Sequence, residues 1–94
     1  MRIEYSKRAI ADLRQIAAYH AGSGNSRTAE RIAAHIQEVI ARIAALPLSG
    51  RPVVQKPAVR VALLPTYRYK IFYTVMGETI RVIHIRHTSR RPYD

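Results

Sequence analysis

Residues 69–87, YKIFYTVMGETIRVIHIRH, decide the fold class of this chain. The first half repeats with a period of two that begins just upstream, which predicts a β-strand whose alternate residues are Tyr67, Tyr69, Ile71, Tyr73 and Val75. Gly77 and Glu78 predict a tight hairpin turn, because glycine adopts positive φ without strain. The second half predicts a strand over residues 79–87, apolar at Ile80, Val82, Ile83 and Ile85. A strand apolar on successive positions is covered on both sides and therefore central in its sheet.

Two further strands are expected upstream of this hairpin. Val59, Val61 and Leu63 alternate with polar or small residues and predict a strand that pairs with the first half of the hairpin. Residues 1–6 alternate in the same way and predict a short N-terminal strand, after which Ser6 can cap a helix. Between residues 46 and 52 the chain is rich in turn-forming residues, and the prolines at 52 and 57 extend this expected connector as far as Pro57, because proline cannot donate a ladder hydrogen bond.

Two amphipathic helices are expected between the N-terminal strand and the connector. Residues 7–20 carry an apolar face at spacings of three and four: Ala9, Leu13, Ile16, Ala17 and His20. Residues 26–46 carry a second: Ala29, Ile32, Ala33, Ile36, Ile40, Ile43 and Ala44. A break rich in glycine and serine, residues 22–25, separates them and predicts an antiparallel helical hairpin. The sequence thus predicts one α+β domain over residues 1–94: an N-terminal strand, a helical hairpin and a three-stranded antiparallel meander.

The charge of the chain is strongly positive and unevenly distributed. The formal net charge is +10, and no acidic residue occurs between Glu38 and Glu78. Residues 51–94 hold nine Lys or Arg against two acidic residues, whereas residues 1–50 hold seven against four. Such a surface attracts nucleic acid or an acidic protein.

Several classes of protein are disfavoured by composition. The chain has no cysteine, so a disulfide framework and a thiolate zinc site are excluded. No apolar run reaches the roughly 20 residues that cross a bilayer, and the N-terminus does not resemble a signal peptide, so a cytoplasmic protein that does not engage membranes is expected. Six carboxylates dispersed along the chain do not suit a metal-dependent nuclease. His84 and His87, three apart on a strand, point to opposite faces rather than to one metal ion, so one half-buried and one exposed histidine are expected. No cofactor and no metal site are therefore expected.

The remaining chemistry lies in basic, tyrosine and histidine side chains on the strands and the C-terminal tail. Metal-free cleavage of RNA needs a base, an acid and cations around one phosphate. The residues that could supply these roles are Arg60, Lys70, Arg86, His87 and Arg90. The same side chains equally suit a solvated basic face that binds anions, with Tyr67, Tyr69 and Tyr73 packed as half-buried sheet residues. Composition and spacing leave both alternatives open.

Order and spacing along nearly the whole chain resemble a known superfamily. The first helix contributes Ala11, Asp12, Leu13, Ile16 and Tyr19, and the second helix with its exit contributes Ala29, Ile36, Ile40, Ile43, Leu46, Pro47 and Gly50. The strands contribute Arg60, YKIFYTV at residues 69–75 and VIHIRHTSRRP at residues 82–92. On these residues the chain resembles the RelE/ParE superfamily of toxins from bacterial type II toxin–antitoxin pairs. The resemblance implies a growth inhibitor that a cognate antitoxin neutralises.

The branches of the superfamily differ in target. The pattern Ala-Asp-Leu-x-x-Ile-x-x-Tyr followed by Leu-Pro-x-x-Gly resembles the ParE-like, plasmid-stabilisation branch, which implies action on DNA gyrase. The RelE branch cleaves mRNA on the ribosome with basic residues that this chain matches incompletely. Lys70 stands where that branch has an arginine, Arg60 has Ala62 rather than a lysine as companion, and Thr88 stands near a second expected arginine; Arg90 and Tyr93 in the tail could compensate. Gyrase is thus the favoured target, an mRNA endonuclease the alternative, and a plain nucleic-acid-binding module the third reading.

Site residues and partners follow from this resemblance. If the chain is a ribonuclease, the expected catalytic residues are Arg60, Lys70, His87 and Arg90. In every reading the expected target-binding residues are Arg60, Arg68, Lys70, Arg86, His87, Arg90 and Arg91. The expected antitoxin is acidic and partly disordered, wraps the helical hairpin, and reaches the basic sheet by way of an unpaired sheet edge.

Overall fold

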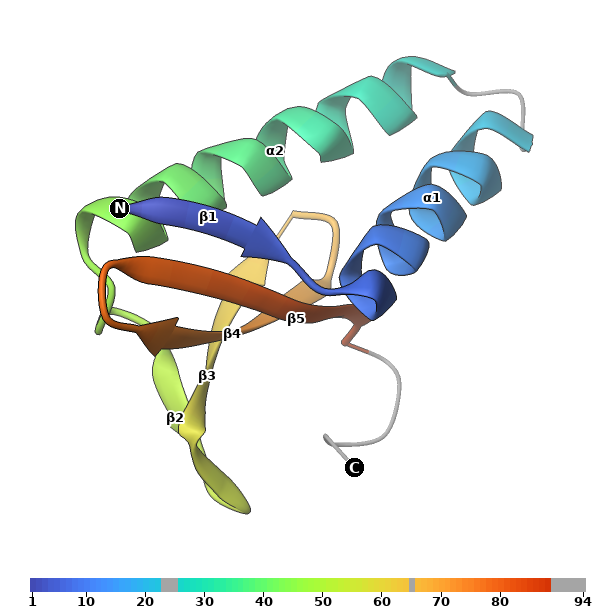
Figure 1. Cartoon of the computed structure of the whole chain (residues 1–94). Helices are drawn as coiled ribbons and strands as arrows, with labels where there is room; N and C mark the ends of the chain where they lie inside the picture. Colours follow the sequence, from blue (N-terminus) through green and yellow to red (C-terminus); the bar gives the residue numbers. More distant parts are fainter. Residues whose placement is uncertain (23–25, 65, 89–94) are drawn as a thin grey trace.

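The structure is a computed structural model that describes residues 1–22, 26–64 and 66–88. Two helices lie over one face of a five-stranded sheet whose strand order is β1-β5-β4-β3-β2 (Figure 1). The elements are β1 (Arg2–Tyr5), α1 (Lys7–Gly22), α2 (Ser26–Ala45), β2 (Arg51–Val53), β3 (Lys56–Leu64), β4 (Tyr69–Met76) and β5 (Thr79–His87). Within the described part of the chain, neither helix is long and apolar enough to span a bilayer. The α+β class, the helical hairpin and the antiparallel meander are confirmed.

The predicted central position of β5 is also confirmed. β5 pairs antiparallel with β4 on one side and parallel with β1 on the other, where the last partners are Tyr5 and Val82. At the turn before it, Gly77 has a φ of 59°, as the hairpin prediction required.

The helices bury the large residues of the predicted apolar stripes, with α2 contributing most, but the predicted Ala17 and Ala33 are exposed and the buried Val39 was not predicted. The buried residues of α2 are Ile32, Ile36, Val39, Ile40 and Ile43. In α1 only Ala9 is fully buried, while Leu13 and Ile16 pack against the core from its margin. Opposite them, Ile71 and Tyr73 of β4 are completely buried. The core therefore lies between α2 and the middle of the sheet.

The expected connector up to Pro57 is wrong in its second half. Residues 51–53 form the edge strand β2, and β3 already begins at Lys56. Pro52 is tolerated because an edge strand leaves one row of its backbone groups unpaired, so a missing N–H need not break the ladder. Tyr67 also falls outside the strand that was expected to contain it: it lies with Arg68 in the turn before β4.

A β-bulge shifts the phase of β5 against β4. Tyr73 is opposite Val82 but Phe72 is opposite His84, so Ile83 is an extra residue on β5. Directly opposed residues share a face of the sheet. Val82 and Ile85 therefore both face the helices although they are three residues apart, and His84 joins Phe72 on the other face. We call the face turned away from the helices the open face.

Candidate functional site

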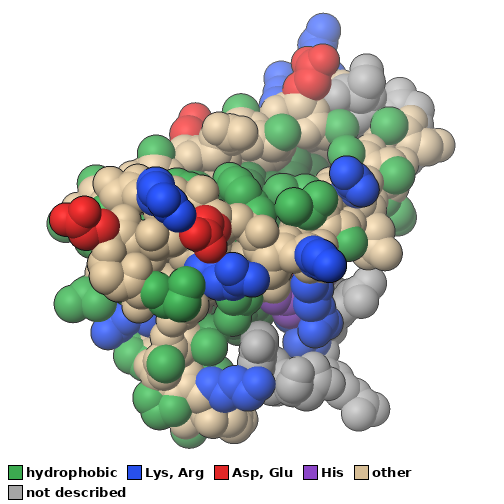
Figure 2. Space-filling view, viewed as in Figure 1, with side chains coloured by type: hydrophobic (Ala, Val, Ile, Leu, Met, Phe, Trp, Pro, Cys, Tyr) green, Lys and Arg blue, Asp and Glu red, His purple; other side chains and the backbone are tan. Residues whose placement is uncertain are grey.

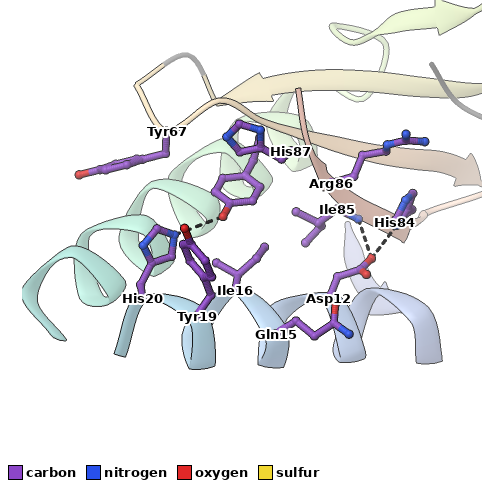
Figure 3. Close-up of a pocket in the computed structure, with 11 residues that line it drawn as sticks. Asp12, Gln15, Ile16, Tyr19, His20, Tyr67, His84, Ile85, Arg86 and His87 are labelled. Carbon is purple, nitrogen blue, oxygen red and sulfur yellow. Dashed lines mark hydrogen bonds and ion pairs between the residues drawn. The ribbon is translucent and has the colours of Figure 1, made fainter. Parts of the chain in front are cut away.

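An open groove of about 650 Å³ runs between α1 and the adjoining ends of β4 and β5. Its lining combines aromatic, imidazole and polar side chains: Asp12, Gln15, Ile16, Tyr19, His20, Tyr67, Tyr69, His84, Ile85, Arg86 and His87 (Figure 3). Its apolar lining comes from Ile16 of α1 and Ile85 of β5, and the rest is mainly tyrosine and histidine rings with a few polar side chains. It brings together residues from three separate parts of the sequence, residues 12–20, 67–69 and 84–87.

Asp12 ties α1 to β5 at one end of the groove. Its Oδ2 accepts a hydrogen bond from the backbone N–H of Ile85 at 2.9 Å and lies 2.6 Å from Nδ1 of His84. An ionised carboxylate can only accept, so Nδ1 of His84 carries the proton. Both side chains are largely shielded from solvent, and the His84 ring stacks on Phe72. The pair therefore fixes the orientation of His84 and the position of the helix together.

The local chain geometry explains why Asp12 is needed there. β1 ends at Tyr5, so β5 has no partner strand on that edge beyond Val82. Ser6 covers the next positions, donating its backbone N–H to the Val82 carbonyl and its hydroxyl to the Ile83 carbonyl. Asp12, two turns into α1, then takes the N–H of Ile85. Ser6 at the start of the helix and Asp12 within it thus bond the backbone groups of β5 that lack a partner strand, as buried backbone groups require.

A chain of aromatic contacts forms the other end of the groove. Nε2 of His20 and Oη of Tyr69 lie 3.2 Å apart in a hydrogen bond. The rings of Tyr69 and His87 meet edge to face at 5.3 Å, and those of Tyr19 and His20 at 5.0 Å. Tyr19 is strongly exposed and stands at the rim. The arrangement offers aromatic surface and hydrogen-bonding groups to a ligand rather than an arranged set of reacting groups.

The structure separates the basic residues that the sequence grouped together. Lys70 is opposite Arg86 across β4 and β5, and both belong to the open face. His87 is opposite Tyr69 and therefore faces the groove on the helix side. The guanidinium of Arg86 points away from the His20–Tyr69 pair in Figure 3, as its open-face register requires.

Arg60 lies on the helix side of the sheet, opposite Tyr73. Its Nη1 donates hydrogen bonds to the carbonyls of Gly50 at 2.7 Å and Leu48 at 3.2 Å. Arg60 and Lys70 therefore belong to opposite faces. In this structure Arg60 holds the chain that follows α2.

Arg68 lies in the turn between β3 and β4 and has a φ of 59°. Its N–H donates to the Leu64 carbonyl and its carbonyl accepts from Thr88, so it joins this turn to the end of β5. Its side chain is exposed. The predicted residues Arg90 and Arg91, together with Tyr93, lie outside the described residues.

Sequence reasoning did not anticipate the groove. It placed His84 and His87 on opposite faces, which the register confirms, but expected one of them exposed, whereas His84 is buried and His87 half-buried. The sequence placed His20 on the apolar face of the first helix and predicted no contact for Asp12. The available signal was an acid in the second turn of a helix that follows a short strand. Among the described residues, no three His, Asp or Glu side chains are grouped to hold a metal ion.

The basic side chains are not confined to one strand. Figure 2 shows Lys and Arg side chains over both the helix layer and the sheet on the side displayed. Geometry thus provides two neighbouring features, the aromatic groove on the helix side and the Lys70–Arg86 pair on the open face.

Comparison with known proteins places this geometry in a family. The family model described as "ParE toxin of type II toxin-antitoxin system, parDE" matches residues 3–92. No curated protein sequence matches the chain. A structure of the chromosomal ParDE toxin–antitoxin system from P. aeruginosa superposes with a TM-score of 0.78 at 24% identity, covering 93% of this chain and 95% of that one.

Two E. coli structures show the same fold at lower identity. The isolated RelE toxin superposes with a TM-score of 0.66 at 16% identity, covering 96% of this chain and 86% of that one. A chain of the intact RelBE toxin–antitoxin complex gives a TM-score of 0.66 at 16% identity, with 96% and 98% covered. At such identities the likeness concerns the fold.

Proposed function

We propose that this chain, which belongs to the ParE family of toxins from type II toxin–antitoxin systems, arrests bacterial growth by acting on DNA gyrase in the cytoplasm. The observation that carries the proposal is the match of the ParE family model to residues 3–92, which leaves almost none of the 94-residue chain outside it. A relative of the same name, the ParDE system of P. aeruginosa, also shares the fold over nearly its full length.

The geometry of the basic residues supports a target that is bound rather than cleaved. Metal-free cleavage of a phosphodiester requires acid, base and cationic groups around a single phosphate. Arg60 is turned to the helix side, where it binds the carbonyls of Leu48 and Gly50, while Lys70 belongs to the open face. These two members of the expected ribonuclease set are separated by the sheet itself.

The test is a supercoiling assay with purified protein, gyrase, relaxed plasmid and ATP. We expect the wild-type protein to abolish supercoiling or to trap cleaved DNA. Replacing Lys70 and Arg86 together with alanine should weaken the effect about tenfold, because two adjacent cations of the open face are lost. Replacing Arg14 and Arg31 with alanine removes the same charge from exposed helix positions and serves as the matched control.

One observation favours the alternative, cleavage of mRNA on the ribosome. Lys70 and Arg86 are adjacent on the open face, where paired cations suit a phosphate backbone. Programmed ribosomes incubated with the protein provide the discriminating experiment. Cleaved mRNA together with unaffected gyrase would reverse the order of the two proposals.

The partner that fits this function is a cognate antitoxin. The RelBE structure contains a toxin of the same fold with its antitoxin. A net charge of +10 favours an acidic chain, and the outer edge of β1 ends the sheet, where an added strand can pair. Co-expression with the product of the neighbouring reading frame should restore growth.

A further inference from the structure

Two leucines stand exposed in the loop that follows α2. Leu46 is 62% exposed and Leu48 is 68% exposed. Isolated exposed leucines are ordinary on protein surfaces. These two lie within three residues, and they belong to residues 46–50, which we call the anchored loop.

The hydroxyl of Tyr73 anchors this loop from below. It accepts a hydrogen bond from the N–H of Gly50 at 2.8 Å and donates one to the carbonyl of Pro47 at 2.9 Å. The Tyr73 side chain is completely buried in the core. A buried core residue thus forms hydrogen bonds with Pro47 and Gly50, on either side of the exposed Leu48.

Arg60 anchors the same loop from β3. Its Nη1 binds the carbonyls of Gly50 and Leu48, the second of which belongs to one of the exposed leucines. Within the loop, the N–H of Ser49 donates to the Leu46 carbonyl at 3.0 Å. The backbone that carries both leucines is therefore fixed before any partner arrives, which lowers the entropy lost on binding.

We propose that the anchored loop is the surface through which this toxin docks on the protein it inhibits, with Leu46 and Leu48 entering an apolar pocket on that target. The Leu-Pro-x-x-Gly pattern, which resembles the ParE-like branch, thereby gains a structural role: Pro47 and Gly50 fix the loop, and Leu46 is exposed. The proposal rests on the proposed function in requiring a protein target such as gyrase.

The chemistry of the occupant follows from the surroundings of the loop. A nucleic acid offers no aliphatic pocket, so the leucines fit a protein. Arg42 before the loop and Arg51 after it are both exposed, and no acidic residue occurs from residue 39 to residue 77. The rim of the complementary pocket is therefore acidic.

The test compares growth arrest and gyrase inhibition by full-length variants. The double variant Leu46→Ser/Leu48→Ser should keep the melting temperature of the wild type, because both side chains are mostly in water, and should lose about tenfold or more in both activities. The control Val54→Ser removes an apolar residue that is 90% exposed in the β2–β3 turn, and it should change neither growth arrest nor gyrase inhibition. Tyr73→Phe leaves both leucines in place but removes the two hydroxyl bonds to Pro47 and Gly50, so it should also weaken arrest while lowering the melting temperature.

Each result decides the proposal. Growth arrest by the leucine variant at wild-type strength, with equal soluble protein, would overturn it, as would cleavage of ribosome-bound mRNA by the wild-type protein. Loss of antitoxin binding with arrest retained would assign the loop to the antitoxin and equally overturn it. If the wild type arrests growth without affecting gyrase and the leucine variant does not arrest growth, the gyrase proposal fails while docking through the loop stands for another protein target.

Discussion

Gly50 occupies a position where no side chain fits. A Cβ built on it would lie 2.4 Å from Oη and 2.7 Å from Cε1 of Tyr73, closer than non-bonded atoms approach. The same proximity allows the Gly50 N–H to reach the Tyr73 hydroxyl. Gly50 is therefore needed twice: its lack of a side chain lets the Tyr73 ring approach, and its N–H then donates a hydrogen bond to the Tyr73 hydroxyl.

We therefore expect Gly50→Ala to destabilise the protein by about 1–3 kcal/mol, the usual cost of forcing extra volume into a packed site. The matched control is Gly22→Ala, because a Cβ on Gly22 meets nothing within 4 Å. Urea denaturation of both variants measures the difference. Equal free energies of unfolding for the two variants would show that the loop accommodates the extra methyl group without loss of stability.

Asp12 accepts hydrogen bonds from two different groups of β5 through one side-chain oxygen. In Asp12→Ala the Ile85 N–H and the His84 Nδ1–H lose their acceptor in a shielded place. We expect a loss of about 2–3 kcal/mol in the free energy of unfolding, from the penalty for unsatisfied buried donors. Asp12→Asn keeps one acceptor oxygen and should lose less. Glu30→Ala, on the exposed face of α2, is the control, and an equal effect of all three changes would contradict this account.

At the scale of elements, the junction of β1, α1 and β5 depends on Ser6. Its hydroxyl accepts from the N–H of Ala9 at 3.0 Å, capping α1, and donates to the Ile83 carbonyl at 2.8 Å. The predicted cap is thus confirmed, and it also covers the edge of β5 beyond the end of β1. One small side chain couples the start of the helix to the sheet.

Ser6→Ala should cost about 1–2 kcal/mol, the typical value for a lost N-cap together with a partly buried hydrogen bond. Hydrogen exchange of the Ala9 amide should accelerate more than exchange at the far end of α1, because the first turn loses its acceptor. Ser49→Ala, at an exposed loop position, is the control. Uniform acceleration along α1 would point to global rather than local loosening.

At the scale of the whole molecule, the net charge of +10 determines how partners approach. Lys and Arg lie on the helix layer and on the sheet, so an acidic chain is attracted over a broad surface rather than to one point (Figure 2). Long-range attraction of this kind raises the rate of encounter more than it slows dissociation.

Association of the antitoxin should therefore slow steeply as salt rises. We expect the on-rate to fall about tenfold or more between roughly 0.05 and 0.5 M NaCl, with a much smaller change in the off-rate, since the Debye length shrinks severalfold over that range. Stopped-flow or surface-binding kinetics with the product of the neighbouring reading frame measure both rates. An on-rate indifferent to salt would remove the electrostatic argument.

Local sequence determined both helices and four of the five strands of this protein, but not the edge strand β2. The hairpin of strands over residues 69–87, the isoleucines of the helical stripes, the turn at Gly77 and the cap at Ser6 appear in the structure as predicted. These features depend on interactions between residues close in the chain, where the spacing of apolar side chains and the preferences of single residues suffice. The family resemblance rested on the same residues and is confirmed over residues 3–92.

Only the tertiary structure decided which functional side chains meet. The bulge at Ile83 reverses the faces of the residues after it, so no count of alternate positions along β5 could place His84. The parallel pairing of β1 with β5 ends at Tyr5, so the N–H of Ile85 has no strand partner and donates its hydrogen bond to Asp12 instead. The separation of Arg60 from Lys70 likewise follows from their register across the sheet. Such contacts join residues far apart in the chain, and local periodicity carries no information about where a ladder starts, slips or stops.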